Sequence, residues 1–224
     1  MRFLKRKNFI ISIIVLSLVM FSQYGNSKDE NSNKMQVNFH NIESDTIKKN
    51  FITVFKKYNQ LHKYKINVYQ KNIGATTMKA QPVISFSNLI RGVKEYKIVV
   101  GESLKDTDIK LSSVPSGVLQ GWFAHELGHV SDYEQHSNMG MLWYAIKYVV
   151  SKSFKKKVEH TADYIALKKG FKKQLLKTKR YILLSDIFSE QYLININQYY
   201  LSIKDVEDYI EEDEDVTLSK MFHE

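Results

Sequence analysis

Residues 113–134 read SVPSGVLQGWFAHELGHVSDYE and contain the motif HELGH at residues 125–129. Around the motif, apolar side chains recur at three- and four-residue spacings, as on a helix that packs into a core. These side chains are Val118, Leu119, Trp122, Phe123 and Val130. Ser113 is the expected N-cap, and Pro115 lies near the first turn, where its missing N–H is not needed. The pattern predicts a buried helix that ends near Glu134.

Two glycines, Gly121 and Gly128, lie inside this predicted helix. Each lowers helix propensity by about 1 kcal/mol relative to alanine. Gly128 lies within HELGH, so it predicts either a close backbone approach beside the motif or simple helix packing.

The HELGH motif itself predicts metal chemistry. On a helix, His125 and His129 lie four residues apart and project from one face about one turn apart. Both ring nitrogens can then reach one zinc ion at about 2 Å. Glu126 leaves the helix beside that face, where it can take a proton from water at the metal. The alternative is a surface helix that carries two histidines for no chemical reason.

A catalytic zinc site needs a third protein ligand. The metzincin pattern requires Gly at position 132 and His at position 135, but this chain has Asp132 and Gln135. That class is therefore excluded. His136 misses the required position by one residue, and we interpret it as a polar loop residue.

A better third ligand lies thirty residues further on, in the run VEHTADYIAL at residues 158–167. If this run is helical, Glu159 and Asp163 share one face one turn apart, with the small Ala162 between them. One carboxylate can bind the metal, and the second can accept the other ring N–H of a ligand histidine. The alternative is an ordinary solvated pair of acidic residues.

HELGH followed by E-x-x-A-D resembles the gluzincin metallopeptidases, in particular small bacterial and membrane-linked peptidases with an HExxH…ExxxD signature. The resemblance covers about residues 114–170. It implies a zincin-like fold, His125, His129 and Glu159 as zinc ligands, Glu126 as general base, and Asp163 as the partner of His125.

The same resemblance implies a Tyr, His or Arg that stabilises the oxyanion, but no motif fixes this residue. The candidates on this ground are Arg180, Tyr181 and His160.

The N-terminus predicts export. Residues 1–7 are basic, residues 9–21 are apolar, and Gly25 and Ser27 are small residues at the positions that a signal peptidase reads. The apolar run is shorter than the roughly 20 residues that a membrane span needs. We therefore interpret residues 1–27 as a signal peptide and expect a periplasmic or secreted protein. An uncleaved N-terminal anchor is the alternative.

The rest of the chain predicts one α+β domain. Polar residues 28–42 form an expected flexible leader, and residues 43–224 form a single metallopeptidase-like domain without cysteines. We expect a helix over 43–62 and then a small sheet built from residues 64–70, 80–87 and 95–101. After the motif helix we expect helices over 139–154, about 158–170, 171–195 and from Ser202 onward. The zinc cleft would lie between a helix-plus-sheet lobe and a helical lobe.

The charge pattern limits the partners. The net charge of +9 falls to +5 without residues 1–27, and the lysines are scattered. No nucleic-acid motif or basic stripe appears, so we expect no nucleic-acid partner. The apolar helix over 139–154 predicts core packing, or alternatively a surface patch with peripheral membrane or envelope contact.

Together these patterns predict an exported zinc-dependent peptidase with one Zn²⁺ per chain, acting on a peptide or protein substrate. One alternative is a non-catalytic zinc-binding structural or interaction domain of the cell envelope. A second is an envelope adaptor that works through the 139–154 surface and its lysines. The substrate, the choice between endo- and exopeptidase, the oligomeric state and a pro-segment role for residues 28–45 remain open at the level of sequence.

Overall fold

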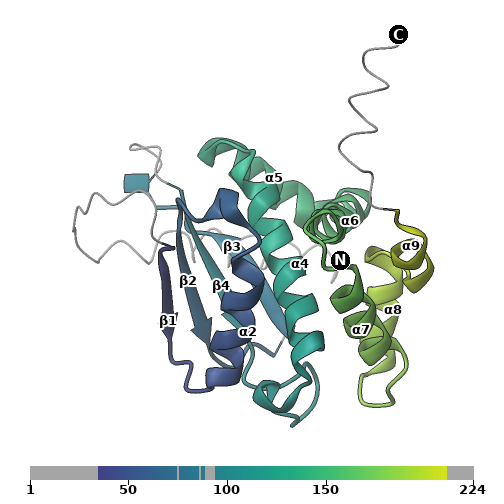
Figure 1. Cartoon of the computed structure of the whole chain (residues 1–224). Coiled ribbons are helices and arrows are strands. Elements are labelled where there is room, and N and C mark those ends of the chain that lie inside the picture. The colour runs from purple at the N-terminus through teal and green to yellow at the C-terminus, as the bar shows by residue number, and fades with distance from the viewer. Residues whose placement is uncertain (1–34, 75, 86, 89–93, 211–224) are drawn as a thin grey trace, which may run out of the picture.

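The computed structural model of the protein describes residues 35–74, 76–85, 87–88 and 94–210. Its architecture is α+β, as the sequence predicts (Figure 1). The described strands form one four-stranded sheet in the order β1-β2-β4-β3. They are β1 (Val37–His40), β2 (Lys65–Gln70), β3 (Met78–Pro82) and β4 (Glu95–Val100). The pairs β1–β2 and β2–β4 are parallel, and β3 runs antiparallel to β4 at the edge.

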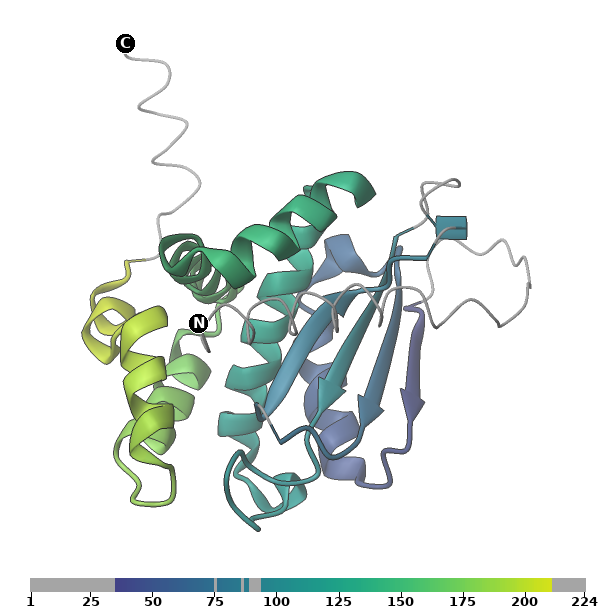
Figure 2. The same cartoon turned by 180° about the vertical axis from the view of Figure 1, so that it is seen from behind.

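Among the described α-helices, α4 takes the central position. They are α2 (Asp45–Phe55), α4 (Ser116–Glu134), α5 (Asn138–Val150), α6 (Lys152–Lys168), α7 (Lys172–Leu183), α8 (Glu190–Tyr199) and α9 (Ile203–Asp208). Helix α4 contacts α2 and β3 on one side and α6 and α7 on the other. Figure 1 shows α4 between the sheet and the later helices, and Figure 2 shows the same order from behind. The motif helix is therefore the central element of the fold.

The first described helix is shorter than predicted. Ser44 caps α2 by accepting a hydrogen bond from the Ile47 N–H, and the helix ends at Phe55 instead of near residue 62. A 3₁₀ turn at Asn59–Leu61 follows. Tyr58 and Leu61 are still fully buried there, so the apolar repeat continued beyond the end of the helix. The Tyr58 hydroxyl donates to the Ala124 carbonyl at 2.7 Å and ties this turn to α4.

The sheet differs from expectation at two places. Residues 37–40, expected within the flexible leader, form β1 because their backbone pairs with β2. Residues 78–82 form β3, whereas we expected a strand over 80–87; Pro82, which has no backbone N–H, is its last residue. The other two strands match their predicted positions within one residue.

The helical part corrects two expectations and confirms a third. Pro115, and not Ser113, is the N-cap of α4. The single helix expected over 171–195 is two helices, α7 and α8, because a break after Leu183 is followed by a new N-cap at Ser189. Ser202 does cap α9, with a reciprocal bond from Asp205.

One hydrophobic core joins the sheet, α2, α4 and the later helices. It includes Phe51 of α2, Ile98 of β4, Phe123 of α4, Leu175 of α7 and Val206 of α9, each at most 2% exposed. None of the described helices is both long and apolar enough to cross a membrane. The predicted signal peptide at 1–27 lies outside the described residues.

Candidate metal centre

Three predicted ligands meet where α4 crosses α6. His125 and His129 come from α4 and Glu159 comes from α6, and none of the three is more than 7% exposed. One ligand atom from each lies within 4.8 Å of the other two. This buried group could hold a metal ion.

The spacing of the ligand atoms fits a tetrahedral ion. Glu159 Oε2 lies 3.1 Å from His125 Nε2 and 3.3 Å from His129 Nε2. In a tetrahedral site with bonds of about 2 Å, neighbouring ligand atoms are about 3.3 Å apart. Both separations from Glu159 are close to this value.

Gly128 explains how the two helices come so close. A Cβ atom at this position would lie 2.4 Å from the Ala162 carbonyl oxygen of α6, closer than real atoms approach. The glycine is thus both a packing residue and the point of close backbone approach. Ala162 stands between Glu159 and Asp163, so this contact aligns both carboxylates with the motif face.

Asp163 orients His125, as the sequence predicts. Its Oδ1 lies 2.9 Å from His125 Nδ1, while Oδ2 accepts from Lys179 Nζ at 2.8 Å and from the Leu201 N–H at 3.2 Å. Burial alone would raise the pKa of Asp163, but Lys179 and His125 outweigh it and lower the pKa to about 2. Asp163 is therefore ionised, and both of its carboxylate oxygens accept hydrogen bonds.

The two carboxylates also act on His125. Burial lowers the pKa of this imidazole, but its hydrogen bonds to Asp163 and Glu159 reverse the effect and raise the pKa to about 10. Burial would also raise the pKa of Glu159, yet the two histidines hold it well below its usual range. Without a metal, a proton on His125 balances the carboxylates. A divalent cation would take over that role.

Glu126 lines a small cavity together with one of the three ligands, His125. The cavity holds about 50 Å³, and Thr77, Met78, Tyr192 and Tyr200 contribute to its wall. Glu126 is 6% exposed, and its Oε2 has no hydrogen-bond partner among the described residues. Burial raises the pKa of Glu126. The backbone of Ala80 hydrogen-bonds to this carboxylate, so only one of its oxygens is unpartnered. A buried carboxylate oxygen without a partner is unusual and fits a group that meets a proton donor there only when water or substrate enters.

Tyrosines that the sequence did not single out surround the centre. The Tyr148 hydroxyl of α5 donates to Glu159 Oε1, and the Tyr133 ring stacks on His129 with a centroid separation of 6.0 Å. The Tyr200 ring lies 5.3 Å from the ring of His125. Lys179 was also missed. Tyr148, Lys179 and Tyr200 come from α5, α7 and the segment after α8, so no local spacing connects them with HELGH. Tyr133 lies on α4 four residues after His129, and helical spacing alone could have found it.

The three oxyanion candidates lie elsewhere. Arg180 is exposed and pairs with Glu207 of α9 at 2.6 Å, and Tyr181 packs edge-on against Trp122. His160 is half-buried on α6, with its Nε2 unpartnered among the described residues. None of the three is among the described residues that line the cavity beside Glu126. Tyr192 and Tyr200, which do line it, are better placed.

Comparisons of the chain with protein-family models, with curated proteins and with solved structures found no match.

Proposed function

We propose that this protein is an exported zinc-dependent peptidase of the gluzincin type. The observation that carries the proposal is the buried group of His125, His129 and Glu159, with Glu126 next to His125 and its Oε2 unpartnered among the described residues. Two imidazoles and a carboxylate are the donor set of catalytic zinc sites, which leave one position open. When bound, zinc would supply a Lewis acid that lowers the pKa of water and polarises a carbonyl group.

Glu126 is the proposed general base. It follows His125 directly in the helix, faces the cavity instead of the Glu159 carboxylate, and has a raised pKa because it is buried. A raised pKa suits a group that must take a proton from the attacking water and return it to the leaving amine. No covalent intermediate is required.

Asp163 and Lys179 are proposed to position His125. Asp163 accepts from one ring nitrogen and leaves the other directed at Glu159. Lys179 is 5% exposed and fixes the second oxygen of Asp163, so the carboxylate cannot rotate away. Such an arrangement fixes the tautomer of a ligand histidine.

The sheet supports a peptide as substrate. Strand β3 is an edge strand that packs against α4, and Met78 of β3 lines the cavity beside Glu126. An extended peptide could add to such an edge through backbone hydrogen bonds. Its scissile bond would then lie beside the proposed general base.

Export is part of the proposal and has its own test. The order of basic, apolar and small residues places the mature N-terminus near Lys28. N-terminal sequencing of the native protein should find this end. An intact Met1 in a membrane fraction would favour the anchor instead.

The activity is tested with a diverse peptide library and the zinc-loaded mature chain. Glu126→Gln keeps the size of the side chain but removes the base, so cleavage should fall by about 10²- to 10⁴-fold while zinc remains bound. His136→Ala is the matched control, because His136 lies outside the centre, 3.9 Å from Asp132. If the zinc-loaded wild type cleaves no peptide, the chain is a non-catalytic zinc-binding domain and the peptidase proposal fails.

A further inference from the structure

The outer face of α5 exposes a continuous apolar stripe. Met139, Trp143, Ile146 and Val150 are 59%, 64%, 49% and 50% exposed. Their spacings of four, three and four residues place them on one side of the helix. Five of the nine exposed large hydrophobic residues in the described chain belong to α5, Val149 being the fifth. Hydrophobic side chains gathered in this way mark a contact surface.

The opposite face of α5 is fixed to the protein. Met141 and Tyr144 are buried against Val158 of α6. The Tyr144 hydroxyl donates to Asp132, and the Tyr148 hydroxyl donates to Glu159. The helix is therefore held in place from within, and its outward stripe is a stable feature of the surface.

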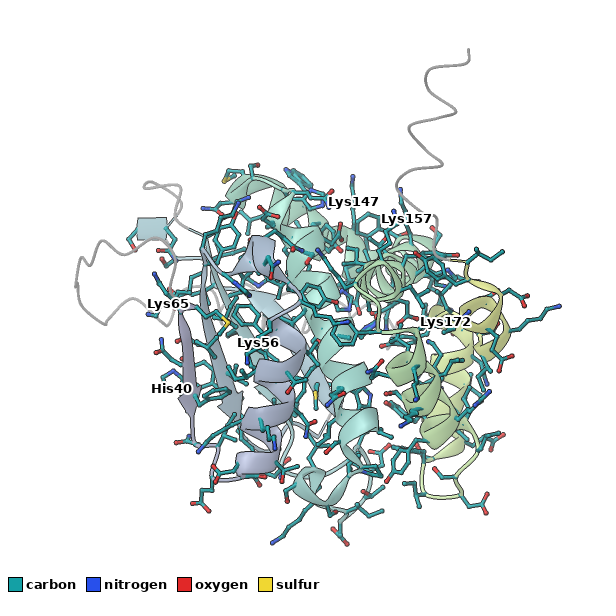
Figure 3. All side chains as sticks on the ribbon, in the orientation of Figure 1. His40, Lys56, Lys65, Lys147, Lys157 and Lys172 are labelled. Carbon is teal, nitrogen blue, oxygen red and sulfur yellow. The ribbon has the colours of Figure 1, made fainter. Side chains whose placement is uncertain are left out.

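Positive charge surrounds the stripe. Between Glu134 and Glu159 the chain has no acidic residue and five lysines. Lys147 lies on α5 itself, and Lys152, Lys156 and Lys157 are exposed on the first turns of α6. Figure 3 shows Lys147 and Lys157 at the same end of the molecule, over α5 and α6. Residues 46–94 and 164–185 also carry basic residues without acidic ones, so the α5–α6 segment is distinguished by having its lysines beside exposed apolar side chains.

We propose that the outer face of α5, with the lysines of α6, docks on an anionic lipid surface. An amphipathic helix with apolar residues on one side and lysines beside them lies in the plane of a membrane interface. A tryptophan such as Trp143 belongs at the level of the headgroups. Phospholipid headgroups supply the negative charge that this segment lacks. A second copy of the chain would bring the same positive charge and be repelled.

Docking through α5 does not require catalysis. It would hold the proposed metal centre close to a lipid surface, because α5 carries the docking stripe on one face and Tyr148 on the other. Substrates within reach would be peptides at or near that surface.

The test uses the chain from Lys28 to Glu224, which keeps every helix and strand that the structure describes. Vesicles of phosphatidylcholine alone are compared with vesicles that also contain phosphatidylglycerol, by flotation at low and high salt. Binding should require the anionic lipid and weaken as salt rises. The chain has two tryptophans and Trp122 is buried, so a blue shift in emission on binding would report Trp143 entering the interface.

Two double variants separate the contribution of the apolar side chains from that of the lysines. Trp143→Ser with Ile146→Ser should abolish the blue shift and most of the binding. Lys152→Gln with Lys156→Gln should weaken binding by about fivefold for each lysine. Matched controls are Leu184→Ser with Ile194→Ser, and Lys168→Gln with Lys173→Gln, which alter exposed residues away from α5. These control variants should bind as the wild type does.

Several results would overturn the proposal. One is wild-type protein that fails to float with the anionic vesicles. Another is a Trp143→Ser, Ile146→Ser variant that binds as tightly as the wild type. A wild-type dimer in light scattering that this variant dissociates would assign the stripe to self-association instead.

Discussion

The crossing of α4 and α6 and the outer face of α5 depart from the usual distribution of residues in opposite directions. The crossing buries charge: His125, Glu126, Glu159, Asp163 and Lys179 are each at most 6% exposed. The α5 face exposes hydrophobic side chains to water. Neither arrangement favours folding by itself, since buried charge and exposed apolar surface are both unfavourable. The two proposals account for this difference: we assign chemistry to the α4–α6 crossing and attachment to the outer face of α5.

The two regions also differ in whether their unusual side chains have partners within the protein. Most buried charges at the crossing have partners, from His125 between two carboxylates to Asp163 against Lys179. The exposed apolar residues have no equivalent support, and we infer that their partner lies outside the chain. Substitutions at the crossing should therefore be costly to the protein alone, whereas those on α5 should matter only when a partner is present.

The largest effect is expected at Asp163. Asp163→Ala leaves Lys179 charged and buried without its partner, which typically costs about 3–5 kcal/mol of unfolding free energy. It also releases the ring of His125, so zinc affinity should fall by about 10- to 100-fold. Urea unfolding and zinc titration measure the two losses.

A second variant identifies the cause of that loss. Asp163→Asn with Lys179→Met removes both charges and should recover much of the stability but not the zinc affinity. Full recovery of both would contradict the orienting role of Asp163.

Gly128→Ala should have a smaller effect. Its new Cβ would meet the Ala162 carbonyl at 2.4 Å and push α6 away from α4. Overpacking of this kind costs about 1–3 kcal/mol, and zinc should bind more weakly because Glu159 moves with α6. Gly74→Ala, in the loop after β2, is the control, since no heavy atom lies within 4 Å of a Cβ atom at that position. Equal zinc affinity in both variants would show that the close contact does not position the ligands.

The smallest effect on stability is expected on α5. Trp143→Ser removes a side chain that is 64% exposed, so the unfolding free energy should change by no more than about 0.5 kcal/mol. Urea unfolding without lipid provides the measurement. A loss of several kcal/mol would mean that Trp143 supports the core, and the contrast between the two regions would disappear.

The sequence predicted the parts of the site that depend on helical spacing. His125 and His129 share a face because they lie four residues apart, and the same holds for Glu159 and Asp163. Lys179 and Tyr148 could not be predicted, because they reach the centre only through the packing of α7 and α5. The sequence could not show whether the stripe on α5 is exposed or buried, because the residues of an apolar helix do not reveal which of its faces other elements cover.

The features of the fold that the sequence did not predict also depend on packing between elements. The apolar repeat of α2 continued through Tyr58 and Leu61, which are buried in a turn instead of a helix. The break between α7 and α8 contains no proline or glycine to mark it. Strand β1 does alternate Val37 and Phe39 with the polar Asn38 and His40, but it lies in the stretch expected to be a flexible leader, and its place in the sheet depends on pairing with β2.

The zinc content of purified ligand variants tests the central claim most directly. The wild type should contain one zinc per chain by elemental analysis, and His129→Ala and Glu159→Ala should lose it. His136→Ala and His160→Ala, which alter histidines outside the group, should retain it. A His129→Ala protein that keeps its full zinc content would contradict the assignment of His125, His129 and Glu159 as the metal centre.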